Sequence, residues 1–143
     1  MKNLLLHVDQ AVATVTLDRP EMRNAFNEDV IAELADTFCS LGARDDVRCI
    51  VLAARGPAFC AGADLNWMKR MADYTRDENV ADATALAAML RTIFECPKPT
   101  IAKVQGDVYA GGTGLVAACD IAVSVDTAGY CLSEVKVGLI PAT

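Results

Sequence analysis

The sequence predicts a single α/β domain, and three observations support this class. Short apolar runs rich in β-branched residues alternate with stretches in which apolar residues recur at helical spacing. The length of 143 residues fits one domain, and a composition of 53% hydrophobic and 22% charged residues excludes intrinsic disorder. No linker or internal repeat divides the chain, so residues 1–143 are expected to form one domain.

The N-terminal part of the chain predicts a hairpin followed by a helix. Residues 4–8 and 11–17 are apolar runs separated by a short polar break, and the second run alternates with period two. Asn27 precedes two acidic residues and a helical pattern of apolar residues. We therefore expect Asn27 to cap a helix that ends near Gly42.

The rest of the chain predicts strands that alternate with helices. Residues 47–54 form a near-continuous apolar run, which is typical of a strand buried on both faces. A short helix is expected around residues 67–74 and a longer one over 80–94. The expected buried side of the longer helix comprises Ala81, Ala85, Ala88, Met89 and Ile93. Further strands are expected at 100–104, 121–125 and 130–132, and a short helix at 115–118, after a glycine-rich bend.

Composition and charge exclude several classes of partner. The net charge is −6, and no basic run exceeds two residues, so we expect no nucleic-acid partner. No apolar run reaches the roughly 18 residues that a membrane span needs, and the N-terminus lacks the pattern of a signal peptide. The six cysteines are widely spaced and there is one histidine, which argues against a metal site. Scattered cysteines are typical of a reducing compartment, so a cytoplasmic location is expected.

Three motifs of nucleotide binding or hydrolysis are present only in part. Residues 106–113 resemble a phosphate-binding loop, but Gly112 stands where that loop needs its lysine. Residues 112–117 fit a dinucleotide-binding pattern, with Glu134 about twenty residues on, yet they lie too late in the chain for that fold. His7 lies in the expected hairpin and no nucleophile-elbow motif exists, so a hydrolase triad is disfavoured.

Two loops of small residues are the strongest candidates for chemistry. Residues 59–65 and 109–114 each follow an expected buried strand and lead into a helix. The N–H groups at a helix start are free to donate hydrogen bonds, and two such loops side by side could hold an oxyanion. The glycines could equally serve close packing of helix against strand. The residues alone leave both interpretations open.

Four segments together resemble the enoyl-CoA hydratase/isomerase (crotonase) superfamily. They are residues 18–26, 58–65, 106–121 and 132–141, and they occur in the family's order and spacing. The resemblance implies an α/β fold built as a crotonase-like spiral of ββα units. Family members are longer in their usual form. The C-terminal helical part is therefore expected to be missing here, and the complete protein is expected to form a homotrimer or hexamer.

The resemblance also implies a site for an acyl-CoA thioester. The backbone N–H groups of Ala63 and Gly111 would bind the thioester oxygen. No cofactor or metal is expected, because coenzyme A is part of the substrate. The residues implied in binding coenzyme A are Arg23, Ala25, Ala61, Gly62, Asp64 and Leu65.

The catalytic carboxylates decide the expected reaction. Hydratases of this family use two glutamates, and this chain carries one of them, Glu134, whereas Gly114 stands at the other position. Residues 131–139 are most similar to hydratases of branched, carboxylated enoyl-CoAs such as methylglutaconyl-CoA, as in leucine degradation. We therefore expect a hydratase. A double-bond isomerase, which needs one base, and a truncated chain without activity of its own are the alternatives.

Overall fold

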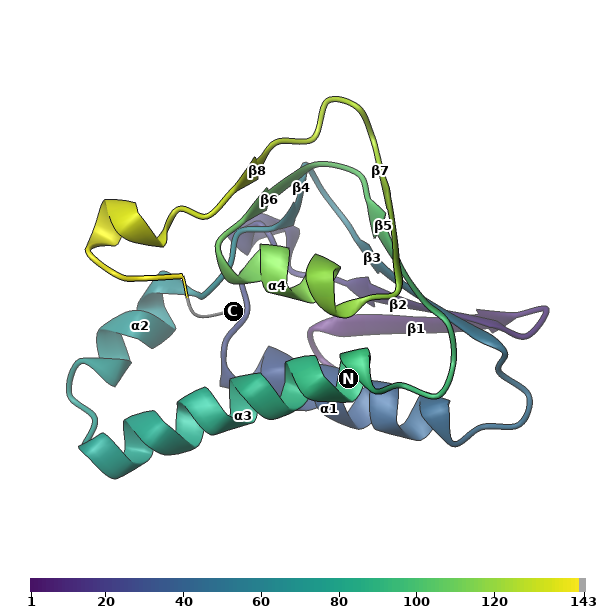
Figure 1. Cartoon of the computed structure of the whole chain (residues 1–143), viewed down its shortest axis with the longest axis horizontal. Coiled ribbons are helices and arrows are strands. Elements are labelled where there is room, and N and C mark those ends of the chain that lie inside the picture. Colours follow the sequence, from purple (N-terminus) through teal and green to yellow (C-terminus); the bar gives the residue numbers. More distant parts are fainter. Residues whose placement is uncertain (142–143) are drawn as a thin grey trace.

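A five-stranded sheet forms one layer of the computed structural model, which describes residues 1–141 (Figure 1). The strands lie in the order β1-β2-β3-β5-β7. The β1–β2 pair is antiparallel and the other pairs are parallel. The strand bounds are Leu4–Asp9 for β1, Val12–Leu17 for β2, Cys49–Ala54 for β3, Thr100–Val104 for β5 and Ile121–Ser124 for β7. The hairpin and the later strands of this sheet lie where the sequence predicts them.

A second, three-stranded parallel sheet has the order β4-β6-β8. Its strands are Ala58–Cys60 (β4), Asp107–Tyr109 (β6) and Tyr130–Cys131 (β8). Each of these short strands follows a strand of the larger sheet along the chain and then leads into a helical segment. The chain thus repeats a strand–strand–helix unit, which confirms the expected spiral of ββα units. The sequence did not predict β4 and β6, because three residues show no periodicity.

The helices pack beneath and beside the sheets (Figure 1). Their bounds are Glu28–Gly42 (α1), Leu65–Met71 (α2), Arg76–Phe94 (α3) and Gly111–Ala118 (α4), with 3₁₀ turns at Pro20–Met22 (η1) and Glu134–Val137 (η2). As predicted, the side chain of Asn27 caps α1 by accepting a hydrogen bond from Val30 N at 3.2 Å. Helix α3 begins earlier than predicted because Thr75 and Glu78 form a capping box.

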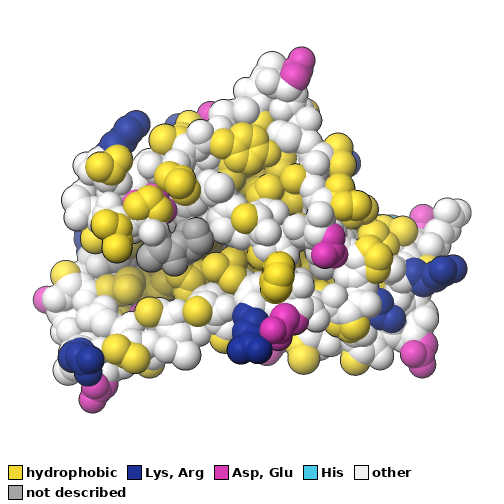
Figure 2. Space-filling view, in the orientation of Figure 1, with side chains coloured by type: hydrophobic (Ala, Val, Ile, Leu, Met, Phe, Trp, Pro, Cys, Tyr) yellow, Lys and Arg dark blue, Asp and Glu magenta, His cyan; other side chains and the backbone are white. Residues whose placement is uncertain are grey.

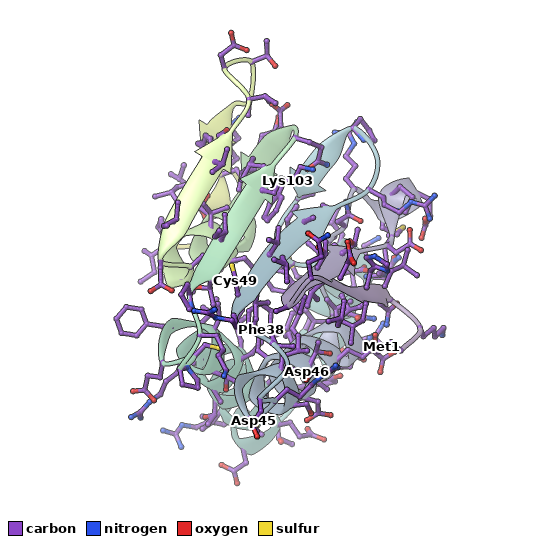
Figure 3. The ribbon with its side chains drawn as sticks, turned by 90° about the vertical axis from the view of Figure 1, so that its right-hand side faces the viewer. Met1, Phe38, Asp45, Asp46, Cys49 and Lys103 are labelled. Carbon is purple, nitrogen blue, oxygen red and sulfur yellow. The ribbon has the colours of Figure 1, made fainter. Side chains whose placement is uncertain are left out.

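The main core lies between the five-stranded sheet and the helices. Ile50 and Leu52 of β3 are fully buried, as are Phe38 of α1 and Met89 of α3. In Figure 3, Phe38 lies on the helix side of the sheet, whereas Lys103 lies on β5 away from the helices. Helices therefore cover one face of this sheet. For that reason β3 alternates between buried and half-buried residues, and the prediction that it is buried on both faces is wrong.

Helix α3 also differs from its prediction. Met89 and Ile93 are buried as expected, but the other residues assigned to the buried side are exposed. These exposed residues are Ala81, Ala85 and Ala88. The N-terminal part of α3 extends past the sheet towards α2, so only its C-terminal part lies over the core (Figure 1). Neither α3 nor any other helix within residues 1–141 combines the length and hydrophobicity needed to cross a bilayer.

Several large apolar side chains remain exposed. Ile121 and Val123 of β7 are 53% and 59% exposed, and Ile140 is 82% exposed. The sequence predicts an exposed apolar patch over residues 138–143, and this holds for Leu139 and Ile140. The last two residues of that patch lie outside the described part of the chain.

Candidate active site

A cavity of about 530 Å³ opens where α2, α3, the start of α4 and the segment after β8 meet. Hydrophobic side chains gather on this face of the molecule in Figure 2, where Figure 1 places these elements. The lining of this cavity is mainly apolar. The lining residues are Phe26, Ala61, Ala63, Leu65, Trp67, Met68, Met71, Ala72, Asp82, Ala83, Leu86, Ala110, Gly111, Ser133, Glu134, Leu139 and Ile140.

The loop that carries Ala63 is fixed by hydrogen bonds to Phe26. Phe26 N donates to the Gly62 carbonyl at 2.9 Å, and Asp64 N donates to the Phe26 carbonyl at 2.9 Å. In such a parallel bridge, the residue between the two bonded residues, here Ala63, directs its own N–H away from the paired strand. The Ala63 N–H therefore makes no hydrogen bond within residues 1–141 and is free to donate.

Gly111 offers a second free donor at the start of α4. It is the first residue of this helix, where N–H groups have no partner in the preceding turn. Ala110 caps the helix with φ 48°, a strained conformation for a residue with a Cβ. The partial positive charge of the helix N-terminus strengthens the attraction between the Gly111 N–H and a negatively charged acceptor. Gly111 is buried and lines the same cavity as Ala63.

The two loops touch, and glycines make this contact possible. A Cβ on Gly62, whose φ is +86°, would lie 3.2 Å from Gly111 N and 2.9 Å from the Ala110 Cβ. A Cβ on Gly111 would lie 2.5 Å from Phe26 Cζ. The close packing that is one interpretation of the glycines is therefore observed, and it brings together two N–H donors. Two donors on adjoining loops can stabilise one oxyanion.

Glu134 brings a carboxylate to this cavity. It is the first residue of η2, and its side chain lines the cavity together with Ala63 and Gly111. Oε2 of Glu134 is buried and has no hydrogen-bond partner among the described residues. A shielded carboxylate oxygen without a partner is able to accept a proton from a bound molecule. The three residues predicted as catalytic thus share one cavity.

Gly114 and Asp120 lie outside the cavity. Gly114 is buried within α4 and supplies no acid or base. Asp120 Oδ2 accepts hydrogen bonds from Thr100 N at 2.8 Å and from Thr100 Oγ1 at 2.9 Å, so it ties the start of β7 to β5. Neither residue lines the cavity. Asp82, from α3, is the other carboxylate in the lining, and the sequence analysis did not single it out.

Asp64 supports the site from outside the cavity. Its side chain caps α2 by accepting from Asn66 N at 2.8 Å, and it pairs with Arg19 at 3.0 Å. Burial opposes ionisation of this carboxyl, but the hydrogen bonds from Arg19, Asn66 and Trp67 outweigh it and lower its pKa. Asp64 therefore holds the Ala63 loop against the segment that contains Arg19.

The remaining residues predicted to bind substrate divide into two groups. Ala61 and Leu65 line the cavity, and Ala61 N donates to the Arg23 carbonyl at 2.9 Å. Ala25 and Gly62 are buried and Arg23 is exposed, and none of these three lines the cavity. Arg23 is close enough to the Asp107 carboxylate to contribute to lowering its pKa, after the larger effects of hydrogen bonds from Gly129 and Tyr109. The structure thus places Arg23 at the surface beside the cavity loops.

Cys60 ends the strand before the Ala63 loop and is chemically inert. Burial raises the pKa of its thiol to about 12, although Gly62 N lies 3.4 Å from the sulfur. A thiol that stays protonated at neutral pH is a poor nucleophile. Of the six cysteines, Cys60 is buried, Cys39 is exposed and the other four are half-buried.

The sequence analysis missed one wall of the cavity. Trp67 and Met71 of α2 were assigned only to a helix, and they line the cavity together with Asp82 and Leu86 of α3. A signal was available in α3. Asp82 precedes Leu86, Met89 and Ile93 at helical spacing, so an acid occupies an otherwise apolar stripe.

Known proteins resemble this chain over nearly its whole length. The model of the family "Enoyl-CoA hydratase/isomerase" matches residues 7–143. An enoyl-CoA hydratase of Alternaria alternata is 40% identical over 133 residues, which are 90% of this chain and 41% of that protein. The 1,2-epoxyphenylacetyl-CoA isomerase of Escherichia coli is 35% identical over 99% of this chain and 54% of its own length.

Solved structures show the same fold. The structure of an enoyl-CoA hydratase from Shewanella pealeana is similar with a TM-score of 0.94 at 41% identity, covering 98% of this chain and 53% of that one. An enoyl-CoA hydratase/isomerase from Marinobacter aquaeolei has a TM-score of 0.92 at 30% identity. The chain spans about half the length of the curated relatives it matches. By its family match, its fold and its motifs, the chain belongs to the enoyl-CoA hydratase/isomerase family.

Proposed function

We propose that this chain provides the thioester-binding and catalytic residues of a hydratase that acts on a 2-enoyl-CoA. The observation that carries the proposal is one cavity lined by Ala63, Gly111 and Glu134. Two free N–H groups and one unpartnered carboxylate oxygen are the groups that addition of water to an enoyl thioester needs. Activity, substrate and partners of the whole protein are part of this proposal.

In the proposed mechanism the thioester oxygen accepts hydrogen bonds from Ala63 N and Gly111 N. When water adds at C3 of the substrate, negative charge moves to this oxygen as an enolate, and the two donors stabilise it. Removing one donor of this kind typically slows a reaction by about 10²–10³-fold. Glu134 accepts a proton from the attacking water, and the carboxyl group then returns a proton to C2.

An isomerase is the second candidate, and a specific observation favours it. Gly114 stands where a second glutamate of the family would act, which leaves Glu134 as the one family carboxylate. One base suffices to move a proton between C4 and C2 of the enolate. The 35% identity to an isomerase of a CoA thioester is consistent with this alternative. A chain that needs further residues for any activity is the third possibility.

The rest of the ligand is assigned to the loops beside the cavity. Coenzyme A would lie along Arg23, Ala25 and the loop from Ala61 to Leu65, with the positive charge of Arg23 toward its phosphates. The mainly apolar lining supports a hydrocarbon chain as the acyl part. No separate cofactor is needed, and assembly into a trimer or hexamer remains a prediction from the sequence.

Substitution of Glu134 tests the assignment of the base. Glu134→Gln keeps the shape of the side chain but removes its proton acceptor. We expect the affinity for a CoA thioester to survive and turnover to fall by about 10²–10⁴-fold, because general acid–base catalysis contributes that much. The measurement is steady-state kinetics with crotonyl-CoA on the protein at its full natural length. Full activity of the variant would refute the role of Glu134 in either reaction.

Isotope labelling separates the hydratase from the isomerase. A hydratase incorporates solvent oxygen at C3, whereas an isomerase only moves hydrogen. Mass spectrometry of the product formed in ¹⁸O-water should show the label at C3. An unlabelled product with a shifted double bond would instead establish the isomerase.

A further inference from the structure

The charges that line the cavity are all negative. Asp82 and Glu134 are the charged residues among the described lining residues, and that lining contains no lysine, arginine or histidine. The neighbouring side chains are mainly apolar, so few polar groups are present to solvate a charge. In such surroundings a second anion is repelled more strongly than it would be in water.

Asp82 is held at the cavity wall by a neighbouring helix. Its Oδ2 accepts a hydrogen bond from the indole Nε1 of Trp67 at 3.3 Å. Trp67 belongs to α2 and is buried, whereas Asp82 belongs to α3 and is half-buried. The bond therefore joins the two helices that form this wall. It uses one carboxylate oxygen and leaves Oδ1 without a hydrogen bond within residues 1–141.

Glu134 enters the same cavity from η2, with its own unpartnered oxygen. Two carboxylates from different elements thus contribute to one mainly apolar space. An acyl chain that ended in a carboxylate would add a third negative charge there, with no described cation to pair with it. Burying an unpaired charge is costly, and like charges at a binding surface favour other ligands.

We propose that Asp82, positioned by Trp67, excludes acyl chains that carry a carboxylate and makes the site selective for uncharged enoyl chains. Glu134 adds to the repulsion through its own charge. The inference rests on the proposed function, because it assumes that the acyl part of a CoA thioester enters this cavity. It departs from the carboxylated substrate that residues 131–139 suggest by resemblance, and it assigns Asp82 a role in specificity.

A pair of ligands that differ in charge tests the proposal without any variant. Glutaryl-CoA and its terminal amide have nearly the same size, and both are saturated, so the site cannot hydrate them. Calorimetry on the full natural polypeptide should give a Kd at least about tenfold lower for the amide. Equal Kd values would overturn the selectivity. If neither thioester binds, the proposed function fails, and the inference fails with it.

A charge substitution then assigns the selectivity to Asp82. Asp82→Asn keeps the size of the side chain, and we expect it to reduce the preference for the amide without abolishing it, mainly through tighter binding of glutaryl-CoA. Some preference should remain because Glu134 is unchanged. The matched control is Asp77→Asn, which removes the same charge from an exposed position of α3 outside the cavity and should leave the ratio unchanged.

The possible results separate the hypotheses. If both ligands bind and the ratio of their Kd values is the same in wild type and Asp82→Asn, only the role of Asp82 is refuted. An equal fall in the ratio for Asp77→Asn would mean that the net charge of α3 decides, which also refutes the specific role. Trp67→Phe retains the Asp82 charge but removes its donor, and we expect it to weaken the preference. A merely structural role of Trp67 would weaken the binding of both ligands and leave the ratio unchanged.

Discussion

A side chain at position 111 would collide with Phe26. The added Cβ would lie 2.5 Å from Phe26 Cζ, and this ring is 1% exposed, so it has little room to move. The same glycine supplies one of the two free N–H groups that line the cavity. Packing and the proposed chemistry therefore depend on one residue, because the absence of a side chain lets the helix start approach the Ala63 loop.

Gly111→Ala should reduce both the stability and the activity of the protein. Overpacking of this kind costs about 1–3 kcal/mol of unfolding free energy. We also expect kcat/KM to fall by about 10²-fold, because a shifted helix start displaces an oxyanion donor. Thermal melts and kinetics on the full natural polypeptide would measure both effects. Gly129→Ala is the control, since its Cβ would meet only the exposed side of Asp107 at 3.2 Å. Unchanged activity in Gly111→Ala would contradict the donor role.

At the scale of elements, the ion pair between Arg19 and Asp64 connects η1 and its flanking segment to the start of α2. Asp64 is 4% exposed and caps the helix, while Arg19 also donates to the Ala25 carbonyl. The pKa of Asp64 is lower than its ordinary value of 3.8. A carboxyl with a lowered pKa stabilises the fold above its unfolded pKa, and this contribution is lost as the pH falls through the folded value.

Asp64→Asn should therefore destabilise the protein in a pH-dependent way. Asparagine caps helices about as well as aspartate, so the substitution mainly removes the ion pair. We expect a loss of about 1–3 kcal/mol at pH 7. The difference from wild type should shrink as the pH falls below about 4, the unfolded pKa of aspartate, and vanish as the pH passes through the lower pKa of folded Asp64. Denaturant titrations between pH 7 and pH 3 would measure this. Asp36→Asn, at an exposed position of α1, should show no such trend, and a difference independent of pH would contradict the assignment.

The elements that the sequence predicted share a clear local signal. Asn27 marks the start of α1, and the alternation in residues 11–17 marks β2. The elements that it missed lack such a signal. Strands β4 and β6 contain three residues each, and they exist because they pair with each other. Propensity and periodicity report local structure, whereas a short strand is fixed by contacts far away in the sequence.

The candidate site likewise contains residues that the sequence identified and one that required the structure. Ala63 and Gly111 lie in loops of small residues that the pattern identified, and the resemblance identified Glu134. Asp82 required the structure, because its place at the cavity depends on how α3 packs against α2, and of the predicted buried side of α3 only Met89 and Ile93 are buried. The orientation of a long helix follows from its neighbours, and the alanines of α3 are too small to define a buried stripe.

At the scale of the whole molecule, the apolar surface is concentrated in two regions. The first is β7, at the edge of the five-stranded sheet, where Ile121 and Val123 are more than half exposed. The second is the segment after β8, where Leu139 and Ile140 are 51% and 82% exposed. An edge strand with exposed apolar side chains readily pairs with another chain, and contiguous apolar surface favours association.

Residues 1–143 expressed alone should therefore self-associate, and β7 should contribute to this. Light scattering and sedimentation at increasing concentration should show oligomers or aggregates, together with binding of an apolar dye. The double substitution Ile121→Lys and Val123→Lys should reduce association without loss of helix content, because both side chains are exposed and lysines protect sheet edges. Leu5→Lys, on β1 at the opposite edge of the same sheet, tests whether any added charge has this effect. If the β7 and β1 substitutions reduce association equally, net charge controls the association rather than the apolar surface of β7. A monodisperse monomer of residues 1–143 would refute the prediction.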